Sequence, residues 1–428
     1  MNVPDRNTSY LTWIAVVALI LAQASILGWS LRKKSPTADE LNYLAAGVAT
    51  WRTGDFRLFR NPPPDQSMLC SIPAVLFWKP VLPLDSPAWS KGQWNGFGED
   101  FARANPTIVL DLVRAGRYVA ILLTCGVSLI VFLLTRRLFH IRVALVVLVF
   151  CVFDPNLAAH GLLVTTDIGA TLGYLLFALA CWSWLKSPTV KRLLLWSLVT
   201  GMACLLKHSG LLLVPCGVSI LLFVLLRSKE NVRQPLTCTA LYLAGIVLTI
   251  WIGYGCEIED FRGRVAFPSP NYLAAVSNQW LQARTGHVTY FLGQLSSGSS
   301  ILFYPVVFLI KTPIPTLILL LFGFIRFIRR RKENEIIVLL PAFLLLAVLL
   351  FVSRTAVGYR HLLPALTLLL VVLGGTAVRR LLLQGRVTQI LLGLMMVWLV
   401  ATNLFIDRCM RYLNTIFDAH PQTELGVA

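Results

Sequence analysis

Long runs of apolar residues fill most of the chain, and short clusters of Lys and Arg separate them. About 20 apolar residues cross the hydrocarbon core of a bilayer as one helix. The pattern therefore predicts eleven membrane-spanning helices, at residues 11–31, 116–135, 141–157, 167–185, 193–207, 209–227, 237–255, 301–325, 335–353, 361–378 and 388–406. We expect the first run to remain as a helix rather than to be cleaved as a signal peptide, because the segment before it has no net positive charge. The predicted fold is an all-α polytopic membrane protein, with residues 1–428 forming a single transmembrane domain.

The predicted connections alternate in charge along the chain. Every second connection is short and basic, at Arg136, Lys186, Arg227, Arg326 and Arg379. Because short cytoplasmic connections carry an excess of Lys and Arg, this side and the amino terminus are expected in the cytoplasm. The two long connections, 32–115 and 256–300, hold most of the acidic residues and are expected outside the cell membrane, in the periplasm or an equivalent compartment. The basic cluster at 32–34 is the exception on that outer side.

The two long outer connections are rich in Trp, Pro and Gly. Such segments are expected to fold as short helices lying at the membrane interface, where Trp is favoured. Residues 68–84 are apolar but are interrupted by three prolines and a lysine, which indicates an interfacial or re-entrant helix rather than another span. The chain has no visible internal repeat, and this disfavours a transporter built from repeated halves.

Composition and charge narrow the class of partners. Of the 428 residues 57% are hydrophobic and 14% are charged, so the expected environment is membrane lipid. The formal net charge of +18 does not indicate a nucleic-acid partner, because the basic residues lie in short clusters between apolar runs, where they orient helices. The nine cysteines have no spacing typical of disulfide or metal frameworks.

Two acidic clusters on the outer side could carry chemistry. Asp39 and Glu40 follow the first span, where a helix start with Thr37 as its cap and Glu40 closing a capping box would also explain them. His160 and Asp167 occur in the next outer connection, and Asp167 opens a span. An acid at the edge of the hydrocarbon is costly and therefore commonly functional. Two such clusters on one face can supply a general base and a partner for a metal or hydroxyl group.

Cations occur near the same face. Lys207 and His208 separate two spans, Arg360 and His361 begin another, and Lys311 lies ten residues into the predicted helix 301–325. Each alone could be an interfacial anchor. Together they suit a phosphate group, because Lys offers a point charge and Arg a planar fork of donors.

The ordered set of these motifs resembles the GT-C glycosyltransferases of the protein O-mannosyltransferase type, which include bacterial lipid A aminoarabinose transferases. The resemblance extends over nearly the whole chain and rests on the following pieces: Asp39-Glu40, Asn61-Pro62-Pro63, Asp154-Pro155-Asn156, His160-Gly161, Thr165-Thr166-Asp167, Leu206-Lys207-His208, His287 to Gly293, Phe303-Tyr304-Pro305, Lys311-Thr312-Pro313 and Tyr359-Arg360-His361. Gln294 stands where many relatives have Glu, and residues 297–300 replace a more aromatic segment, which bears on the acceptor and on metal use.

The resemblance implies an inverting transfer of a sugar from a dolichyl- or undecaprenyl-phosphate carrier to an acceptor hydroxyl at the outer membrane face. Asp39 would be the base that activates the hydroxyl, and Glu40 and Asp167 would hold the acceptor or a cation. The donor phosphate would be bound by a cationic set: Lys207, His208, Lys311, Arg360 and His361. The candidates for binding the acceptor or a metal are His160, His287 and Gln294.

Cofactor and partner expectations follow from the same resemblance. A divalent cation, Mg²⁺ or Mn²⁺, could bind at Asp39 and Asp167. The acceptor would be a protein, a lipid or a glycan, and the connections 32–115 and 256–300 would form its side of the enzyme.

Two other functional classes predict different patterns. A secondary transporter or flippase would spread its charges along a midplane pathway, whereas these residues gather near one face. An O-antigen ligase or lipid-linked polymerase would lack the early Asp39-Glu40 pair and would carry a large late outer loop.

Overall fold

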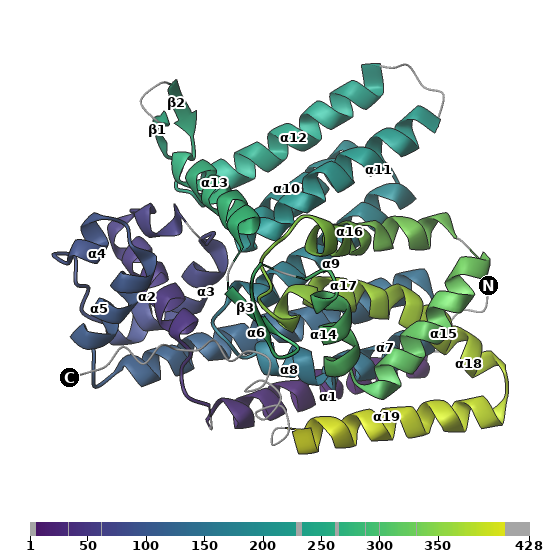
Figure 1. The fold of residues 1–428 in the computed structure, drawn as a ribbon. Helices are drawn as coiled ribbons and strands as arrows, with labels where there is room; N and C mark the ends of the chain where they lie inside the picture. Colours follow the sequence, from purple (N-terminus) through teal and green to yellow (C-terminus); the bar gives the residue numbers. More distant parts are fainter. Residues whose placement is uncertain are drawn as a thin grey trace.

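The computed structural model describes residues 6–32, 34–60, 62–227, 233–261, 265–286, 288–298, 300–330 and 332–406, and these residues are mostly helical (Figure 1). The helices at the predicted spans are α1 (Arg6–Leu31), α6 (Val109–Leu138), α7 (Ile141–Val152), α9 (Thr166–Lys186), α10 (Val190–Leu206), η3 (His208–Leu212) with α11 (Leu213–Arg227), α12 (Arg233–Gly253), α14 (Phe303–Lys311), α15 (Ile314–Arg330), α16 (Glu333–Phe351), η4 (Tyr359–Leu362) with α17 (Leu363–Leu369), η5 (Leu370–Gly374) and α18 (Gly375–Leu383), and α19 (Arg386–Ile406). The predicted all-α polytopic fold is confirmed.

The number of full spans is smaller than the number of predicted helices. Among the described residues, eight helices are long and apolar enough to cross a membrane, or nine if the bent pair α14 and α15 is counted as one span. The helices α7 and α10 have 12 and 17 residues, and are therefore shorter than a typical span. The apolar pattern thus located the helices correctly but did not distinguish complete spans from shorter buried helices.

The single helix predicted at 301–325 is wrong. The chain bends by 118° between α14 and α15, at Thr312 and Pro313. Thr312 has an extended backbone with φ −84° and ψ 130°. Pro313 explains the break, because a proline lacks the backbone N–H and disfavours the helical conformation in the residue before it.

The helix predicted at 141–157 also ends earlier, at Val152. The carboxylate of Asp154 accepts hydrogen bonds from the backbone N–H groups of Asn156 and Leu157, at 3.0 and 2.9 Å. Asp154 is thereby the cap of a separate short helix, α8 (Pro155–His160), with proline at its first position. The sequence feature that ends one helix is therefore the one that starts the next.

The outer connections fold into small elements. Residues 32–115 form the short helices that the sequence predicts: α2 (Ala38–Thr53), η1 (Arg57–Arg60), α3 (Asp65–Pro73), the π-helix η2 (Ala74–Trp78), α4 (Pro87–Ser90) and α5 (Trp94–Ala104). Residues 256–300 contain α13 (Pro270–Thr285) and two antiparallel hairpins, β1 (Ile258–Phe261) with β2 (Val265–Pro268), and β3 (Val288–Phe291) with β4 (Gln294–Ser297). The hairpins correct the expectation of helices alone. The β3–β4 turn is made by Leu292 and Gly293, whose φ angles are both positive, as a tight hairpin requires.

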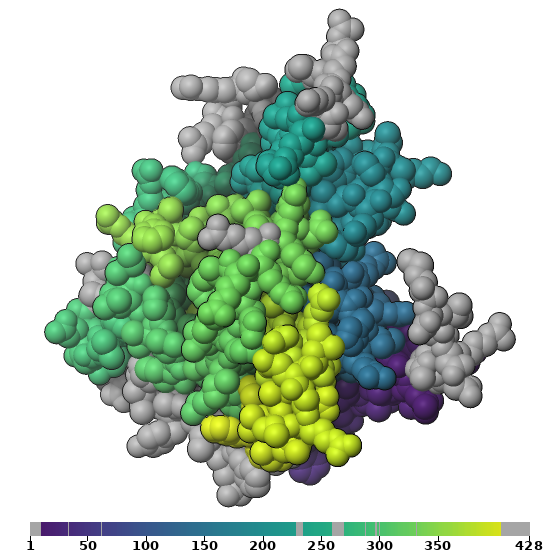
Figure 2. All heavy atoms as spheres, turned by 90° about the vertical axis from the view of Figure 1, so that its right-hand side faces the viewer, coloured from purple at the N-terminus to yellow at the C-terminus, as the bar shows by residue number. Residues whose placement is uncertain are grey.

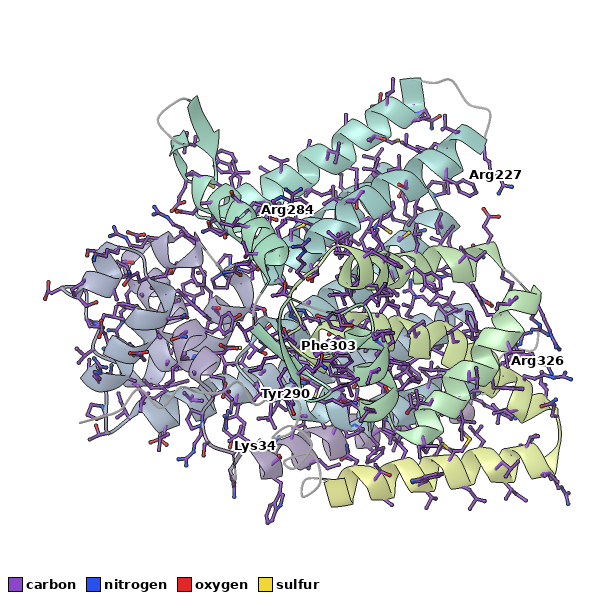
Figure 3. The ribbon with its side chains drawn as sticks, in the orientation of Figure 1. Lys34, Arg227, Arg284, Tyr290, Phe303 and Arg326 are labelled. Carbon is purple, nitrogen blue, oxygen red and sulfur yellow. The ribbon has the colours of Figure 1, made fainter. Side chains whose placement is uncertain are left out.

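The two sides predicted from charge lie at opposite ends of the molecule. Arg227 and Arg326 stand at one end, whereas Lys34, Arg284 and Tyr290 lie toward the other (Figure 3). The small outer elements α2 to α5 gather at that second end in Figure 1. Figure 2 views the first end, where the green and yellow segments that contain α15 and α19 meet. Connections that are predicted on opposite sides of the membrane are therefore also separated in space.

Packing separates a membrane-type body from the outer elements. The largest buried cluster joins apolar side chains of α6, α9, α10, α16, α17 and α18, and a second cluster lies under α2 and α5. Large apolar side chains also remain exposed on the outside of the helices, for example Leu122 at 69%, Leu321 at 62% and Val397 at 67%. Large apolar side chains exposed along helices are expected where the helices face lipid rather than water.

Candidate active site

The first predicted carboxylates lie in the first turn of α2, at the outer side of the membrane body. The backbone N–H of Thr37 donates to Oε2 of Glu40 at 2.9 Å, so the capping box expected from the sequence is present. This cap fixes the direction in which α2 begins. Asp39 and Glu40 are successive residues of that turn, and their side chains consequently point to different surroundings.

Glu40 belongs to a buried ion pair. Arg117 of α6 donates through Nε to Oε1 of Glu40 at 2.8 Å and through Nη2 to Oε2 at 2.7 Å. Oε1 also accepts from the backbone N–H of Val164 at 3.1 Å. The side chains of Arg117 and Glu40 are 1% and 0% exposed. Glu40 therefore joins α2, α6 and the segment before α9, and its oxygens are occupied by protein donors.

Arg117 was not identified as a site residue from the sequence. It lies inside an apolar run, where a single arginine resembles an interfacial anchor. Its remaining donors bind the backbone carbonyls of Lys34 and Ser35, both at 2.8 Å. Arg117 thus ties the start of α6 to the chain just before α2, and this contact positions the neighbouring Asp39.

Asp39 pairs with Arg360 in a more open setting. Nη1 of Arg360, in η4, donates to Oδ2 of Asp39 at 3.1 Å. The two side chains are 28% and 43% exposed, respectively. The partners are 321 positions apart in the chain, so only the tertiary fold brings them together.

Asp167 forms a second pair with a predicted cation. Nζ of Lys207 lies 2.5 Å from Oδ1 of Asp167, at side-chain exposures of 18% and 4%. The hydroxyl of Thr165 donates to Oδ2 at 3.0 Å. Asp167 stands in the first turn of α9 and Lys207 follows α10, so these two packed helices present the pair.

The two pairs belong to one cluster. Arg360, His361 and His160 lie close enough to the Asp167 carboxylate to interact with it electrostatically. Tyr43, one turn after Asp39 in α2, is hydrogen-bonded to Thr166. Burial and the nearby Asp39 carboxylate raise the pKa of the Tyr43 phenol, which therefore stays protonated and able to donate. Four of the residues selected from sequence as catalytic residues or phosphate ligands, Asp39, Asp167, Lys207 and Arg360, thus lie together.

Lys311 is buried at the end of α14, next to the bend. Its backbone carbonyl accepts from Nδ2 of Asn156 at 2.9 Å. The hydroxyls of Thr312 and Tyr359 lie 2.7 Å apart, and Tyr359 directly precedes Arg360. The bend that contains Lys311 is therefore attached to the element that carries Arg360.

The other predicted site residues lie elsewhere or are not described. The ring of His208 packs at 6.0 Å from that of Tyr272 in α13. Gln294 is exposed at the start of β4, and His287 lies outside the described residues. His208 thus contacts the second outer connection, and Gln294 is an exposed residue of that connection.

The arrangement does not fit a divalent cation. Asp39 and Asp167 are each paired with a basic side chain. Over the described ranges no three His, Cys, Asp or Glu side chains are grouped as metal ligands would be. Two carboxylates already neutralised by Arg and Lys do not supply the oxygen-rich set that Mg²⁺ or Mn²⁺ prefers.

Comparison with known proteins addresses the family and the fold. Residues 104–254 match the sequence model of a family described as dolichyl-phosphate-mannose-protein mannosyltransferase. Curated protein sequences yield no match. The matched segment runs from the last residue of α5 to the residue after α12, and so contains Arg117, Asp167 and Lys207.

Solved structures of similar fold include ArnT from Cupriavidus metallidurans. Its apo state has a TM-score of 0.55 at 15% identity, covering 87% of this chain and 60% of ArnT. ArnT bound to undecaprenyl phosphate has a TM-score of 0.59 at 12% identity, covering 93% of this chain and 72% of ArnT. The oligosaccharyltransferase AglB from Archaeoglobus fulgidus, in complex with an inhibitory peptide and a dolichol-phosphate, gives 0.57 at 14% identity, with coverage of 98% and 59%.

The chain spans about 60% of the length of the apo ArnT and AglB structures that it matches. At these identities the likeness concerns the fold, and the family match concerns the segment 104–254. Both agree with the resemblance drawn from the ordered motifs. This chain is therefore a polytopic membrane protein with the GT-C glycosyltransferase fold, and its residues 104–254 match the dolichyl-phosphate-mannose-protein mannosyltransferase family.

Proposed function

We propose that this protein is a membrane glycosyltransferase that moves a sugar from a polyprenyl-phosphate carrier to an acceptor hydroxyl. The observation that carries the proposal is the cluster in which two carboxylates, Asp39 and Asp167, meet two cations, Arg360 and Lys207, at 3.1 and 2.5 Å. A base and a phosphate-binding group are the two functions that such a transfer needs. The undecaprenyl phosphate bound to ArnT and the dolichol-phosphate bound to AglB support this class of donor.

The reaction can be written with the residues of this cluster. The acceptor oxygen attacks the anomeric carbon, and the bond from that carbon to the phosphate oxygen breaks on the opposite side, which inverts the configuration. The acceptor proton passes to the Asp39 carboxylate, and the bonding electron pair stays on the phosphate. Arg360 and Lys207 stabilise this growing negative charge, since fixed cations aimed at a developing anion lower the barrier.

We further propose an order of events, which the contact between Asp39 and Arg360 supports. In this structure Oδ2 of Asp39 accepts a hydrogen bond from Arg360, so the carboxylate has to leave the guanidinium before that oxygen can take a proton. A donor phosphate that enters the cluster competes with Asp39 for the guanidinium. Donor binding therefore frees the base at the moment when the sugar arrives. Lys207 can bind the phosphate without leaving Asp167, because its ammonium group has three donors, and the buried Asp167 carboxylate then holds Lys207 in place.

Glu40 takes no part in acceptor binding in this scheme. Its oxygens are held by Arg117 and by backbone donors, and it is fully buried. We assign it the role of positioning Asp39 through the first turn of α2. This replaces the role of an acceptor ligand that the family resemblance implies for it.

We further place the cluster at the outer face of the cell membrane, with the amino terminus and Lys332 in the cytoplasm. The short basic connections support this orientation. Cysteine-accessibility labelling in intact cells tests it, with Asp39→Cys expected to react from outside and Lys332→Cys only after permeabilisation. Labelling of the 256–300 segment from the cytoplasm alone would contradict the site.

The function itself is tested by mass spectrometry of lipids, glycans and glycoproteins from cells with and without the protein. We expect a sugar modification that disappears without the protein, returns with the wild-type chain, and does not return with Asp39→Asn. A modification profile that is identical in all three strains would reject the proposal.

A further inference from the structure

A polar pocket lies at the end of α2 opposite to Asp39. It has a volume of about 370 Å³ and is bounded by the end of α2, η1, the junction of α4 with α5, and the start of α13. All nine lining residues are polar or glycine. Pockets of several hundred cubic ångströms are typical of small-ligand sites, but those are mostly apolar. The lining therefore excludes a lipid chain and favours a ligand covered with hydroxyl groups.

The two walls of the pocket are held by their own hydrogen bonds. On one wall Arg57 is paired with Asp55 at 2.6 Å, and its guanidinium lies 4.8 Å from the ring centroid of Trp89. On the other wall Asn271 donates to Oε2 of Glu257 at 2.9 Å. These contacts fix the polar groups in place before any ligand binds, which lowers the entropic cost of binding.

Arg60 connects the two walls, and part of its guanidinium group is available to a ligand. Its Nε donates to Oδ1 of Asn271 at 2.9 Å. Within the described ranges its two terminal nitrogens donate to no protein acceptor. They form a planar pair of donors that matches two neighbouring oxygens on a ligand.

The charge of the pocket further restricts the chemical class of its ligand. Two arginines, Arg57 and Arg60, are balanced by Asp55 and Glu257. A balanced set does not select a polyanion, but it offers both donors and acceptors to a group that can do both. Vicinal hydroxyls of a sugar ring have this property, since each donates one hydrogen bond and accepts others.

We propose that this pocket binds a saccharide unit of the acceptor, which rests on the proposed transferase function. The helix α2 has 16 residues and joins the pocket to Asp39, so the two lie roughly 20 Å apart along its axis. An acceptor that occupies both positions is extended. The pocket therefore favours a glycan or the sugar headgroup of a glycolipid over a small alcohol as the acceptor.

Two neighbouring exposed residues provide a matched test. Ser90 lines the pocket and Lys91 does not, and both are exposed in the same turn. Ser90→Tyr should fill the pocket without disturbing the paired walls, and Lys91→Tyr adds the same side chain outside it. Arg60→Ala removes the terminal guanidinium nitrogens that are available to the ligand. Thermal melting of each variant verifies the fold, and binding of undecaprenyl phosphate should stay within twofold of wild type.

Direct binding is measured by saturation-transfer NMR on the full-length protein in lipid nanodiscs, with maltose and N,N′-diacetylchitobiose as probes. We expect saturation transfer to at least one probe in the wild type, in Lys91→Tyr and in Asp39→Asn, and a roughly tenfold weaker response in Ser90→Tyr and Arg60→Ala. Absence of a response to both probes in the wild type, or an equal response in Ser90→Tyr, overturns the saccharide site.

The transfer product provides the second readout. Ser90→Tyr should lower the amount of the modified product in cells about tenfold, whereas Lys91→Tyr should not. A modified product that is present at the same level in cells without the protein would reject the transferase function while leaving saccharide binding standing. Normal product in Ser90→Tyr with the loss confined to Asp39→Asn would reject the pocket while leaving the transferase function standing.

Discussion

Asp39 and Glu40 are neighbours in one helical turn, and each is paired with an arginine, yet the two pairs differ in exposure. The Glu40–Arg117 pair is closed, with side-chain exposures of 0% and 1%. The Asp39–Arg360 pair is open, at 43% and 28%. Glu40 also accepts backbone hydrogen bonds from Thr37 and Val164, so its pair is part of the scaffold of α2.

The difference in burial determines which pair can exchange its partner. Removing one member of a buried pair leaves an uncompensated charge, at a cost of about 3–5 kcal/mol. An exposed pair is worth only about 0–1 kcal/mol, so another anion can replace one partner at little cost. Glu40 and Arg117 therefore form a fixed pair that holds the backbone. Asp39 and Arg360 form an exchangeable pair, in which a donor phosphate can take the place of Asp39 on Arg360.

The largest expected effect is on catalysis at the open pair. Asp39→Asn keeps the shape of the side chain and removes the base, so transfer should fall by roughly 10²- to 10⁴-fold. Thermal melting should change little, because the exposed pair contributes little to stability. A single-turnover transfer assay with the purified protein measures the effect. Activity within about twofold of wild type would place the base on another residue.

Breaking the closed pair should affect folding instead. Arg117→Met leaves Glu40 buried without a cation, and we expect a loss of about 3–5 kcal/mol in the free energy of unfolding. Arg114→Met, in an exposed pair with Asp111 on the same helix, is the control and should cost less than about 1 kcal/mol. Melting in nanodiscs compares the two variants. Equal melting temperatures would mean that the buried pair does not hold α2.

Much of the membrane body could be predicted from the sequence because long apolar runs have few stable alternatives to helices in lipid. The breaks at Pro155 and Pro313 were misjudged, since each proline lies within or beside a run whose hydropathy continues across it. The hairpins of the second outer connection were missed because strands of four residues are too short to show an alternating pattern.

The site was predicted in its members but not in its pairing. The sequence places Asp39, Asp167, Lys207 and Arg360 on one side of the membrane, and the family resemblance assigns them roles. Which cation meets which carboxylate depends on how α2, α9 and η4 pack, and the Asp39–Arg360 contact spans 321 positions. Arg117 was missed because its partner is identified only by the fold.

Asp154 extends the comparison to a buried carboxyl group whose structure-stabilising contacts are backbone donors rather than a cation. Burial raises its pKa to about 6, although hydrogen bonds from the Leu157 and Asn156 backbone lower it in part. The unfolded value is about 3.9, so the folded state binds the proton more tightly. The stabilisation by protonation is therefore complete below about pH 4 and is lost as the pH rises through 6.

Because the folded state holds the Asp154 proton more tightly, the stability of the wild type should depend on pH in a way that the stability of Asp154→Asn does not. The side chain in Asp154→Asn is neutral at every pH and keeps an oxygen to cap α8. The titration of this position therefore makes no contribution to the pH dependence of the variant's stability. Relative to the variant, the wild type should lose on the order of 2–3 kcal/mol between pH 4 and pH 7. Melting temperatures of both proteins at the two pH values measure the difference, and parallel curves would contradict the raised pKa.

Donor affinity tests the two cations of the cluster, Arg360 and Lys207. Arg360→Ala should weaken the binding of undecaprenyl phosphate in nanodiscs by about ten- to a hundredfold, because a charge-assisted contact is worth roughly 1.5–3 kcal/mol. Arg360→Lys should restore binding only partly, since lysine lacks the planar fork. Lys207→Ala is expected to act in the same direction. Wild-type affinity in both alanine variants would remove the donor site from this cluster.

The smallest expected effect discriminates best between a fixed and an exchangeable pair. If donor phosphate and Asp39 compete for Arg360, then Asp39→Asn removes the competitor and should raise the affinity for undecaprenyl phosphate. Because the exposed pair is worth no more than about 1 kcal/mol, the gain should be at most about fivefold. Asp55→Asn, which opens the Arg57 pair outside the cluster, is the control and should leave the affinity unchanged. The contrary outcome is an unchanged or weaker affinity in Asp39→Asn, measured beside a loss of binding in Arg360→Ala. Arg360 would then bind the phosphate without leaving Asp39, and Asp39 would have to act as the base while it is paired.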